Sequence, residues 1–225
     1  MMATMKRASV QRTSTKELIS LVEQACLVAK DAATNLLDYI ENSSKMALLA
    51  VRDCEKELDR MERLVDQKIT SAITEVSENE ARQLLACLKF IIDLERIGDL
   101  TWSVAQRLQA LVVRRAADDD HDLAAMARML EGVLDRIYQG FVKRDLASAT
   151  WVLQQDSRMD QTYRSLFNRH LQGSDRRRRE YSTNLLLMAQ ALERAGDHAK
   201  NLGEELFHLV EGRSVRHERK KSQTA

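Results

Sequence analysis

The chain has 225 residues, with no proline and only 7 glycines, whereas an average sequence of this length holds roughly 11 prolines and 16 glycines. Folds rich in tight turns, such as β-sandwiches and barrels, depend on those two residues, so their scarcity argues against these classes. Hydrophobic residues make up 44% of the chain, which permits a sizeable core. The formal net charge of +1 gives no global field that would favour binding to nucleic acid or to a membrane.

Three features indicate a cytoplasmic protein. The cysteines, Cys26, Cys54 and Cys87, are odd in number and lack metal-ligand spacing, which suits free thiols in a reducing compartment. Residues 1–14 carry basic side chains but no apolar segment of the kind that a signal peptide needs. The chain contains no run of about 18 apolar residues that could span a bilayer.

Three helices are predicted in the first half of the chain. Residues 15–41 place apolar side chains at spacings of three and four, which builds one apolar stripe along a helix. The residues up to Ser44 interrupt this pattern and offer a cap for a second helix over residues 45–69. Ser77 followed by Glu80 has the spacing of a capping box, which predicts the start of a third helix ending near residue 113.

Residues 114–122, RRAADDDHD, are dense in charge, and we predict that they form a linker. Three further helices are predicted after it. Gly140 favours an end to the first of these helices, and Asp145 can cap the next. The three predicted ranges are 123–138, 146–171 and 175–210. Residues 213–225 are predicted to be a loose basic tail.

The two halves repeat each other. The segment Leu94-Glu95-Arg96-Ile97-Gly98-Asp99 recurs as Leu192-Glu193-Arg194-Ala195-Gly196-Asp197, with five of six residues identical at an offset of 98. Both copies fall in the last predicted helix of their half. We therefore predict an all-α protein of six helices, built by internal duplication as two tandem three-helix bundles over residues 15–113 and 123–212.

The duplication keeps pairs of carboxylates four residues apart, which share one face of a helix. Each half has one such pair on its second helix and one on its third helix. The pairs are Glu55 and Asp59, Glu95 and Asp99, Asp156 and Asp160, and Glu193 and Asp197. Chance predicts about five pairs at this spacing, and eight occur, so the spacing alone carries little information. The repetition is what makes these four pairs candidates for a site.

Gly98 and Gly196 lie inside predicted helices, where glycine costs about 1 kcal/mol relative to alanine. Each precedes the aspartate of a carboxylate pair, and its missing side chain would leave space beside the acids. A hollow lined by oxygens suits a hard cation or a cluster of iron, zinc, manganese or magnesium ions, which would also offset the repulsion between carboxylates. The alternative is a solvated acidic face with glycines that permit close helix packing.

The repeated motif resembles a known family. Residues 192–205 are similar to the L-E-R-x-G-D-H-x-x-N-x-x-E-E-type helix of the PhoU family of bacterial phosphate-signalling proteins. Residues 94–100 resemble the first-repeat copy of that motif, and residues 53–59 and 156–160 resemble the acidic helix that precedes it. The resemblance covers residues 18–212 and implies two three-helix bundles side by side, with metal clusters held on the surface by the acidic pairs.

The motif of the second half continues to Asn201 and Glu205, one and two turns after Asp197, and the resemblance adds both as candidate metal ligands. The first half has Ser103 and Arg107 at those places. Because a cationic arginine would weaken a cation site, we predict that the second-half site is the better occupied.

The resemblance also implies a non-enzymatic, cytoplasmic adaptor that negatively regulates phosphate uptake and phosphate-regulon signalling. The implied partners are the ATPase subunit of the phosphate ABC importer and a membrane sensor histidine kinase. A homo-oligomer, a dimer, is expected, attached to the membrane only through its partners. Binding to nucleic acid is not expected, because no stacking aromatics interrupt the arginines of residues 176–179. Two alternatives stay open: a helical-bundle carboxylate-metal oxidase or hydrolase, and an accessory protein of an ion-coupled phosphate carrier.

Overall fold

The computed structural model describes residues 14–74, 76–111, 116–171 and 176–213. These residues form six α-helices and no strand, which confirms the all-α prediction. The helices are α1 (Thr15–Asn42), α2 (Lys45–Ala72), α3 (Glu78–Ala110), α4 (Ala117–Lys143), α5 (Leu146–His170) and α6 (Arg176–Glu211). None of the described helices is both long and apolar enough to cross a membrane.

Two helix boundaries in the middle of the chain differ from the prediction. The segment predicted to be a linker is helical from Ala117 onward, six residues before the expected start of α4. Asp118, Asp119 and Asp120 occupy the first turn, where carboxylates interact favourably with the positive end of the helix dipole. The density of charge therefore marks a helix N-terminus rather than a loop. α3 ends at Ala110, and residues 112–115 lie outside the described residues.

Gly140 does not end α4, which continues to Lys143. A Cβ atom at Gly140 would lie 2.5 Å from Leu206 Cδ2 and 2.8 Å from Ser148 Cβ. The glycine thus allows α5 and α6 to approach α4 closely. The helix ends instead at Arg144, whose φ of +54° places it in the left-handed region.

The other capping predictions agree with the structure. The hydroxyl of Ser77 accepts a hydrogen bond from the Glu80 backbone N–H, and the Glu80 carboxylate accepts one from the Ser77 backbone N–H. Ser44 caps α2 and Asp145 caps α5 through their side-chain oxygens. These bonds satisfy amide groups that the first turn of a helix leaves without partners.

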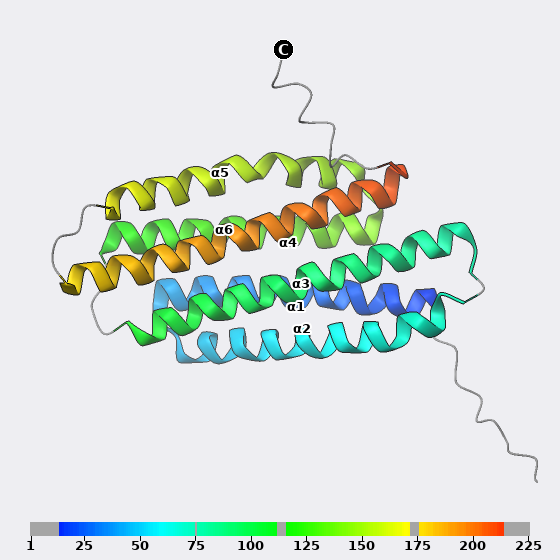
Figure 1. Ribbon diagram of the computed structural model, residues 1–225, viewed down its shortest axis with the longest axis horizontal. Coiled ribbons are helices and arrows are strands. Elements are labelled where there is room, and N and C mark those ends of the chain that lie inside the picture. Colours follow the sequence, from blue (N-terminus) through cyan, green and yellow to red (C-terminus); the bar gives the residue numbers. More distant parts are fainter. Residues whose placement is uncertain (1–13, 75, 112–115, 172–175, 214–225) are drawn as a thin grey trace, which may run out of the picture.

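The helices form two three-helix bundles that pack side by side (Figure 1). α1, α2 and α3 form the first bundle, and α4, α5 and α6 form the second. α1 packs against α4, and α3 packs against α6, so the bundles meet through their first and third helices. α2 and α5 lie at opposite edges of the molecule.

The α1–α4 interface shows how the repeats are related. Lys30 Nζ lies 2.7 Å from Asp135 Oδ1, and Thr34 Oγ1 donates a hydrogen bond of 2.9 Å to Glu131 Oε1. At the offset of 101 residues that relates α2 to α5, Asp135 and Glu131 correspond to positions 34 and 30. A pseudo-twofold axis that exchanges the two helices therefore carries each of these contacts onto the other, and the helices run antiparallel.

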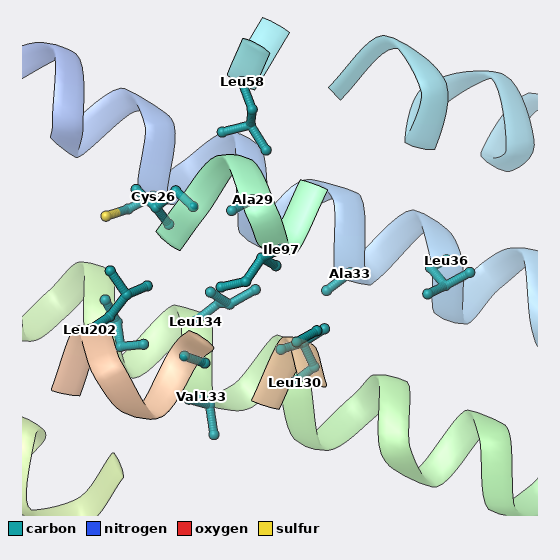
Figure 2. Packing of buried hydrophobic residues seen from close by; sticks show 14 of the residues in the cluster. Cys26, Ala29, Ala33, Leu36, Leu58, Ile97, Leu130, Val133, Leu134 and Leu202 are labelled. Atoms are coloured by element: carbon teal, nitrogen blue, oxygen red, sulfur yellow. The ribbon is translucent and has the colours of Figure 1, made fainter. Parts of the chain in front are cut away.

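One continuous core spans both bundles. Figure 2 shows Cys26, Ala29 and Ala33 of α1 beside Leu130 and Leu134 of α4. The small α1 side chains let the two backbones come close, and each is fully buried. Because the core runs through this interface, the two repeats stabilise each other rather than folding as separate bodies joined by a linker.

Two glycines in exposed and buried settings test this packing. A Cβ at Gly203 of α6 would lie 2.7 Å from Val152 Cγ1, whereas a Cβ at Gly132 of α4 would meet nothing within 4 Å. We expect Gly203→Ala to lower the free energy of unfolding by about 1–3 kcal/mol through overpacking. Gly132→Ala should raise it by up to about 1 kcal/mol through helix propensity. Chemical denaturation measures both, and a stabilising Gly203→Ala would contradict the close approach of α5 and α6.

Candidate functional site

The structure brings the four predicted acids of the first repeat together on the faces that α2 and α3 share. Burial and then the neighbouring Asp99 and Asp59 raise the pKa of Glu55. Burial, Asp99 and Glu62 raise the pKa of Glu95. Such mutual effects require the carboxylates to lie close to one another. We call Glu55, Asp59, Glu62, Glu95 and Asp99 the acidic cluster.

Glu62 is a member that the sequence analysis did not select. Burial and then Asp66 raise its pKa, with smaller contributions from Asp59 and Asp99. It lies one turn after Asp59 on α2 and forms a carboxylate pair with Asp66, which was a usable signal. The comparison of repeats hid it, because position 163 of the second repeat is a tyrosine.

Glu95 is the most buried acid of the cluster, with 11% of its side chain exposed. Its Oε2 atom is buried and accepts no hydrogen bond, and Arg96 Nε lies 3.4 Å away. A buried carboxylate oxygen without a hydrogen bond is costly. A cation in the cluster would supply the missing partner.

Two arginines compensate the outer carboxylates of the cluster. Arg63 NH1 lies 2.6 Å from Asp59 Oδ1, and Arg96 NH1 lies 3.3 Å from Asp99 Oδ2. In the described part of the chain, no three carboxylate, histidine or cysteine side chains converge as the ligands of a metal ion do. The arginines are exposed, and exposed ion pairs contribute about 0–1 kcal/mol. A cation would therefore displace them at small cost.

Gly98 has a different role from the one that its position among the acids suggested. A Cβ at Gly98 would lie 2.6 Å from Cδ1 of the fully buried Leu58. Leu58 fills the space that the sequence analysis assigned to a hollow between carboxylates, so that interpretation is wrong for the first repeat. Gly196 is less crowded, because its Cβ would lie 3.4 Å from the nearest atoms of Met159.

Three of the four predicted acids of the second repeat have described side chains. Asp160 of α5 and Glu193 of α6 are half-buried, Asp197 is exposed, and the Asp156 side chain lies outside the described residues. Position 163, which corresponds to Glu62, holds a tyrosine. The second repeat thus has no carboxylate at the position equivalent to Glu62 of α2.

Asn201 and Glu205 face the first repeat instead of extending the acidic pair of α6. Asn201 Nδ2 donates a hydrogen bond of 3.4 Å to Asp93 Oδ1 of α3. Glu205 Oε2 lies 2.9 Å from Lys89 Nζ, and Glu205 is only 6% exposed. Since each step of four residues turns about 40° around a helix, Glu205 points about 80° away from Asp197. Both side chains thus contact the first repeat, and their assignment as metal ligands stays a prediction.

The same interface holds His198, whose Nδ1 lies 2.8 Å from Asp93 Oδ1. Asp93 thus contacts both His198 and Asn201 across the α3–α6 boundary. These motif residues tie the repeats together. The sequence favours the second-repeat site, and which site is the better occupied stays a prediction.

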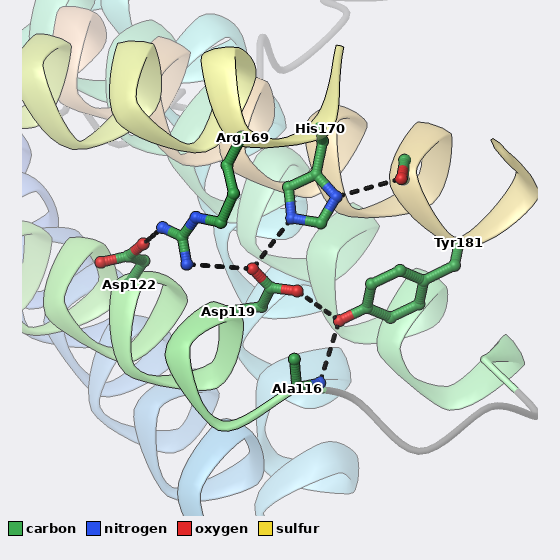
Figure 3. Close-up of polar contacts among 7 residues, drawn as sticks. Ala116, Asp119, Asp122, Arg169, His170 and Tyr181 are labelled. Atoms are coloured by element: carbon green, nitrogen blue, oxygen red, sulfur yellow. Dashed lines mark hydrogen bonds and ion pairs between the residues drawn. The ribbon is translucent and has the colours of Figure 1, made fainter. Parts of the chain in front are cut away.

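A buried polar network at the other end of the second bundle escaped the sequence analysis (Figure 3). Asp119 is 2% exposed and accepts a hydrogen bond of 2.7 Å from the Tyr181 hydroxyl. His170 Nε2 lies 2.9 Å from Asp119 Oδ1, and Arg169 bridges Asp119 and Asp122. Burial and the bond to Asp119 raise the pKa of Tyr181 to about 12.

This network joins the start of α4 to the end of α5 and the start of α6. All of its members have partners, since Ser182 Oγ lies 3.0 Å from His170 Nδ1. A carboxylate so fully occupied offers no open position for a ligand, so we assign the network to stability. Sequence reasoning missed it because Asp119 falls in the segment predicted to be a linker.

Glu95 provides a test of the strain in the acidic cluster. Because its pKa is raised in the folded state, the folded protein binds more protons than the unfolded chain, and the free energy of unfolding falls as the pH rises through that pKa. We expect Glu95→Gln to be more stable than wild type at pH 7, by on the order of 1 kcal/mol, and not at pH 4. Denaturation at both pH values measures this. The exposed control Glu180→Gln should show no such difference.

Asp119 provides a second test. Asp119→Ala would leave the Tyr181 hydroxyl and the Arg169 guanidinium without their buried partner, and loss of one partner of a buried pair costs about 3–5 kcal/mol. Asp118→Ala, at an exposed position of the same turn, should change the free energy of unfolding by less than about 1 kcal/mol. Equal effects in thermal or chemical denaturation would contradict the stabilising role of the network.

Comparison with known proteins agrees with this architecture. A family model described as the PhoU domain matches the chain twice, over residues 22–108 and 123–206. Each match falls within one three-helix bundle.

Two curated relatives illustrate the similarity. A "Phosphate-specific transport system accessory protein PhoU homolog" of Xylella fastidiosa is 28% identical over 205 residues, covering 88% of this chain and 85% of that protein. A homolog of the same description from Rhizobium meliloti is 31% identical over 173 residues, covering 73% of this chain and 71% of that protein.

Solved structures share the fold. The crystal structure of PhoU from Pseudomonas aeruginosa has a TM-score of 0.77 at 22% identity, covering 88% of this chain and 97% of that one. The phosphate transport system regulatory protein PhoU from Streptococcus pneumoniae has a TM-score of 0.79 at 19% identity, covering 89% and 97%. Both crystal structures thus share the overall fold of this chain.

Proposed function

Since this chain belongs to the PhoU family, we propose that it is an adaptor that negatively regulates phosphate uptake and phosphate-regulon signalling. The family consists of accessory and regulatory proteins of phosphate transport, not of enzymes. The proposed partners are the ATPase subunit of a phosphate ABC importer and a membrane sensor histidine kinase. The observation that carries the proposal is the double match of the family model, one match to each bundle.

The acidic cluster is the part of the surface that we assign to metal. Glu95, with its buried Oε2 atom, and the neighbouring Glu55 and Asp99 would hold the ion. A bound ion would neutralise carboxylates that raise one another's pKa and would turn a negative surface into a neutral or positive one. Arg63 and Arg96 would be released to solvent or to a partner protein.

The donor set narrows the choice of metal. All five members of the cluster are carboxylates, and oxygen-only sites suit hard cations such as magnesium, manganese and iron. Zinc, which the sequence analysis also allowed, is held mostly by cysteine and histidine. Within the described residues, neither of these two residue types lies in the acidic cluster. We therefore propose manganese, magnesium or iron for this site.

A cytoplasmic location is part of the proposal. The three thiols are free, and burial raises the pKa of the Cys26 and Cys87 thiols, which makes them poor nucleophiles. Free, unreactive thiols suit a reducing compartment. Attachment to the membrane would then come through the partners, and a dimer remains a prediction.

The second candidate is an accessory role with a sodium- or proton-coupled phosphate carrier. The fold suits both candidates equally, since each role needs a helical surface rather than a catalytic centre. Only the identity of the partner separates them.

The proposal is tested by immobilising the full chain and measuring binding of the importer's ATPase subunit, the cytosolic domain of the kinase, and the cytosolic segments of an ion-coupled carrier, with and without manganese. We expect saturable binding to the first two. Manganese should raise the melting temperature of the wild-type protein and should do so at least several-fold less in a Glu55→Gln, Glu95→Gln double variant, because the variant lacks two of the proposed ligands.

Glu180→Gln is the matched control, as an exposed acid on α6 outside the acidic cluster. Binding to the carrier segments alone would replace the adaptor proposal with the second candidate. An equal rise in melting temperature in the double variant and in wild type would contradict a metal site at the acidic cluster.

A further inference from the structure

The outer face of α5 differs sharply from that of α2, its counterpart in the first repeat. At three positions where α2 has a polar residue, the second repeat has a large apolar one, in the last two turns of α5 and at its C-cap. The corresponding residues, first repeat before second, are Glu62 and Tyr163, Asp66 and Phe167, and Thr70 and Leu171. The change converts an acidic edge of the molecule into an apolar one.

These apolar side chains are exposed. Phe167 is 40% exposed and Leu171 is 60% exposed, whereas Tyr163 is half-buried against the core. The rings of Tyr163 and Phe167 lie 6.2 Å apart, so the surface is continuous. In the described part of the chain, α5 packs only against α4 and α6 and forms one edge of the molecule (Figure 1). Exposed contiguous apolar surface of this kind marks an interaction site.

The surface is shaped to receive a side chain. A hollow of about 260 Å³ is lined by Tyr163, Arg164, Phe167 and Asn168. These residues stand at positions i, i+1, i+4 and i+5 of one helix, so the hollow lies between two ridges of side chains. Such a groove accepts the ridge of a second helix. We call the four lining residues and Leu171 the aromatic surface.

The charge of this part of α5 has one sign. Residues 161–171 contain Arg164, Arg169 and His170 and no aspartate or glutamate. Arg169 and His170 contact carboxylates of α4, those of Asp119 and Asp122. Arg164 is exposed and lines the hollow, so it is the charge that a ligand would meet.

From this combination we propose that the aromatic surface docks an acidic amphipathic helix of a partner protein. An apolar side chain of that helix enters the hollow beside the rings of Tyr163 and Phe167, and a neighbouring carboxylate pairs with Arg164. Aromatic and arginine side chains are the residues that most often dominate binding energy at interfaces. The inference rests on the proposed function, because it names the face with which the adaptor holds a partner.

A second copy of this chain is a poorer occupant. Symmetric pairing of two α5 helices would bring the Arg164 side chains of both copies together. Like charges at an interface are unfavourable. The nearest carboxylate of α5, that of Asp160, is half-buried one turn before Arg164. The proposal therefore assigns the acidic helix to another protein.

The test uses the full chain and three fluorescent 16-residue helical peptides with the same leucine positions and with glutamate, glutamine or lysine at the flanking positions. Fluorescence anisotropy should show that the glutamate peptide binds at least tenfold more tightly than the lysine peptide. Phe167→Ala and Arg164→Gln should each weaken its binding at least fivefold. The control Trp151→Ala removes another exposed aromatic of α5, about 24 Å away along the helix, and should leave binding unchanged.

Equal binding of the three peptides, no binding, or no effect of Phe167→Ala would overturn the proposal. Flotation with phosphatidylglycerol vesicles that depends on Phe167, without peptide binding, would assign the surface to lipid. A dimer in sedimentation that Phe167→Ala converts to a monomer would assign it to a second copy. Both results would also overturn the proposal. We expect both variants to unfold at the same temperature as wild type, because both side chains are exposed. That result excludes loss of the fold as the cause of weaker binding.

The same variants separate this inference from the proposed function. If the ATPase subunit binds wild type and both variants equally, the aromatic surface is not the docking face, and the adaptor role stands. If the glutamate peptide binds as expected while neither the ATPase subunit nor the kinase binds, the docking surface stands, and the choice of partners in the proposed function is wrong.

Discussion

Antiparallel packing of α1 on α4 and of α3 on α6 is the constraint from which the rest of the structure follows. The fully buried Ala29 and Ala33 allow α1 to approach its partner closely, and close approach of two helices maximises the dispersion contacts between them. Once the first and third helices of each repeat are used in this way, α2 and α5 can lie only at the edges. The two edges are where the acidic cluster and the aromatic surface are found.

Polar contacts across the α3–α6 boundary fix the register of that packing. The pair between Lys89 and Glu205 and the contact between Asp93 and His198 are both partly buried. Buried ion pairs recover little more than the cost of desolvating them, so their main contribution is to disfavour a shifted alignment of the helices. This explains why residues that look like an extension of a metal site serve the interface instead.

The duplicated halves have diverged in what their edges offer. The first edge concentrates carboxylates, and folding keeps them near one another although each raises the pKa of the next. That repulsion is free energy that a cation can release on binding. The second edge has exchanged two of those positions for Tyr163 and Phe167. One ancestral surface has thus become acidic on one side of the molecule and apolar on the other.

Much of the fold could be predicted from the sequence, because the signals are local or repeated. The apolar spacing of α1, the capping box at Ser77 and the recurrence of the 94–99 motif depend only on neighbours along the chain. The misplaced start of α4 has a local cause too. A run of aspartates is compatible both with a loop and with the first turn of a helix. The sequence alone therefore does not show which of the two structures forms.

By itself, the sequence determined the all-α class and the duplication, because these follow from periodicity and from identity between halves. Only the tertiary structure decided which carboxylates are neighbours. Glu62 joins the acidic cluster because α2 lies against α3, and the carboxylate of Glu205 contacts Lys89 because α6 lies against α3. Leu58 fills the space beside Gly98 for the same reason. Spacing along one helix fixes a direction around its axis, but the neighbour in that direction is set by how the helices pack.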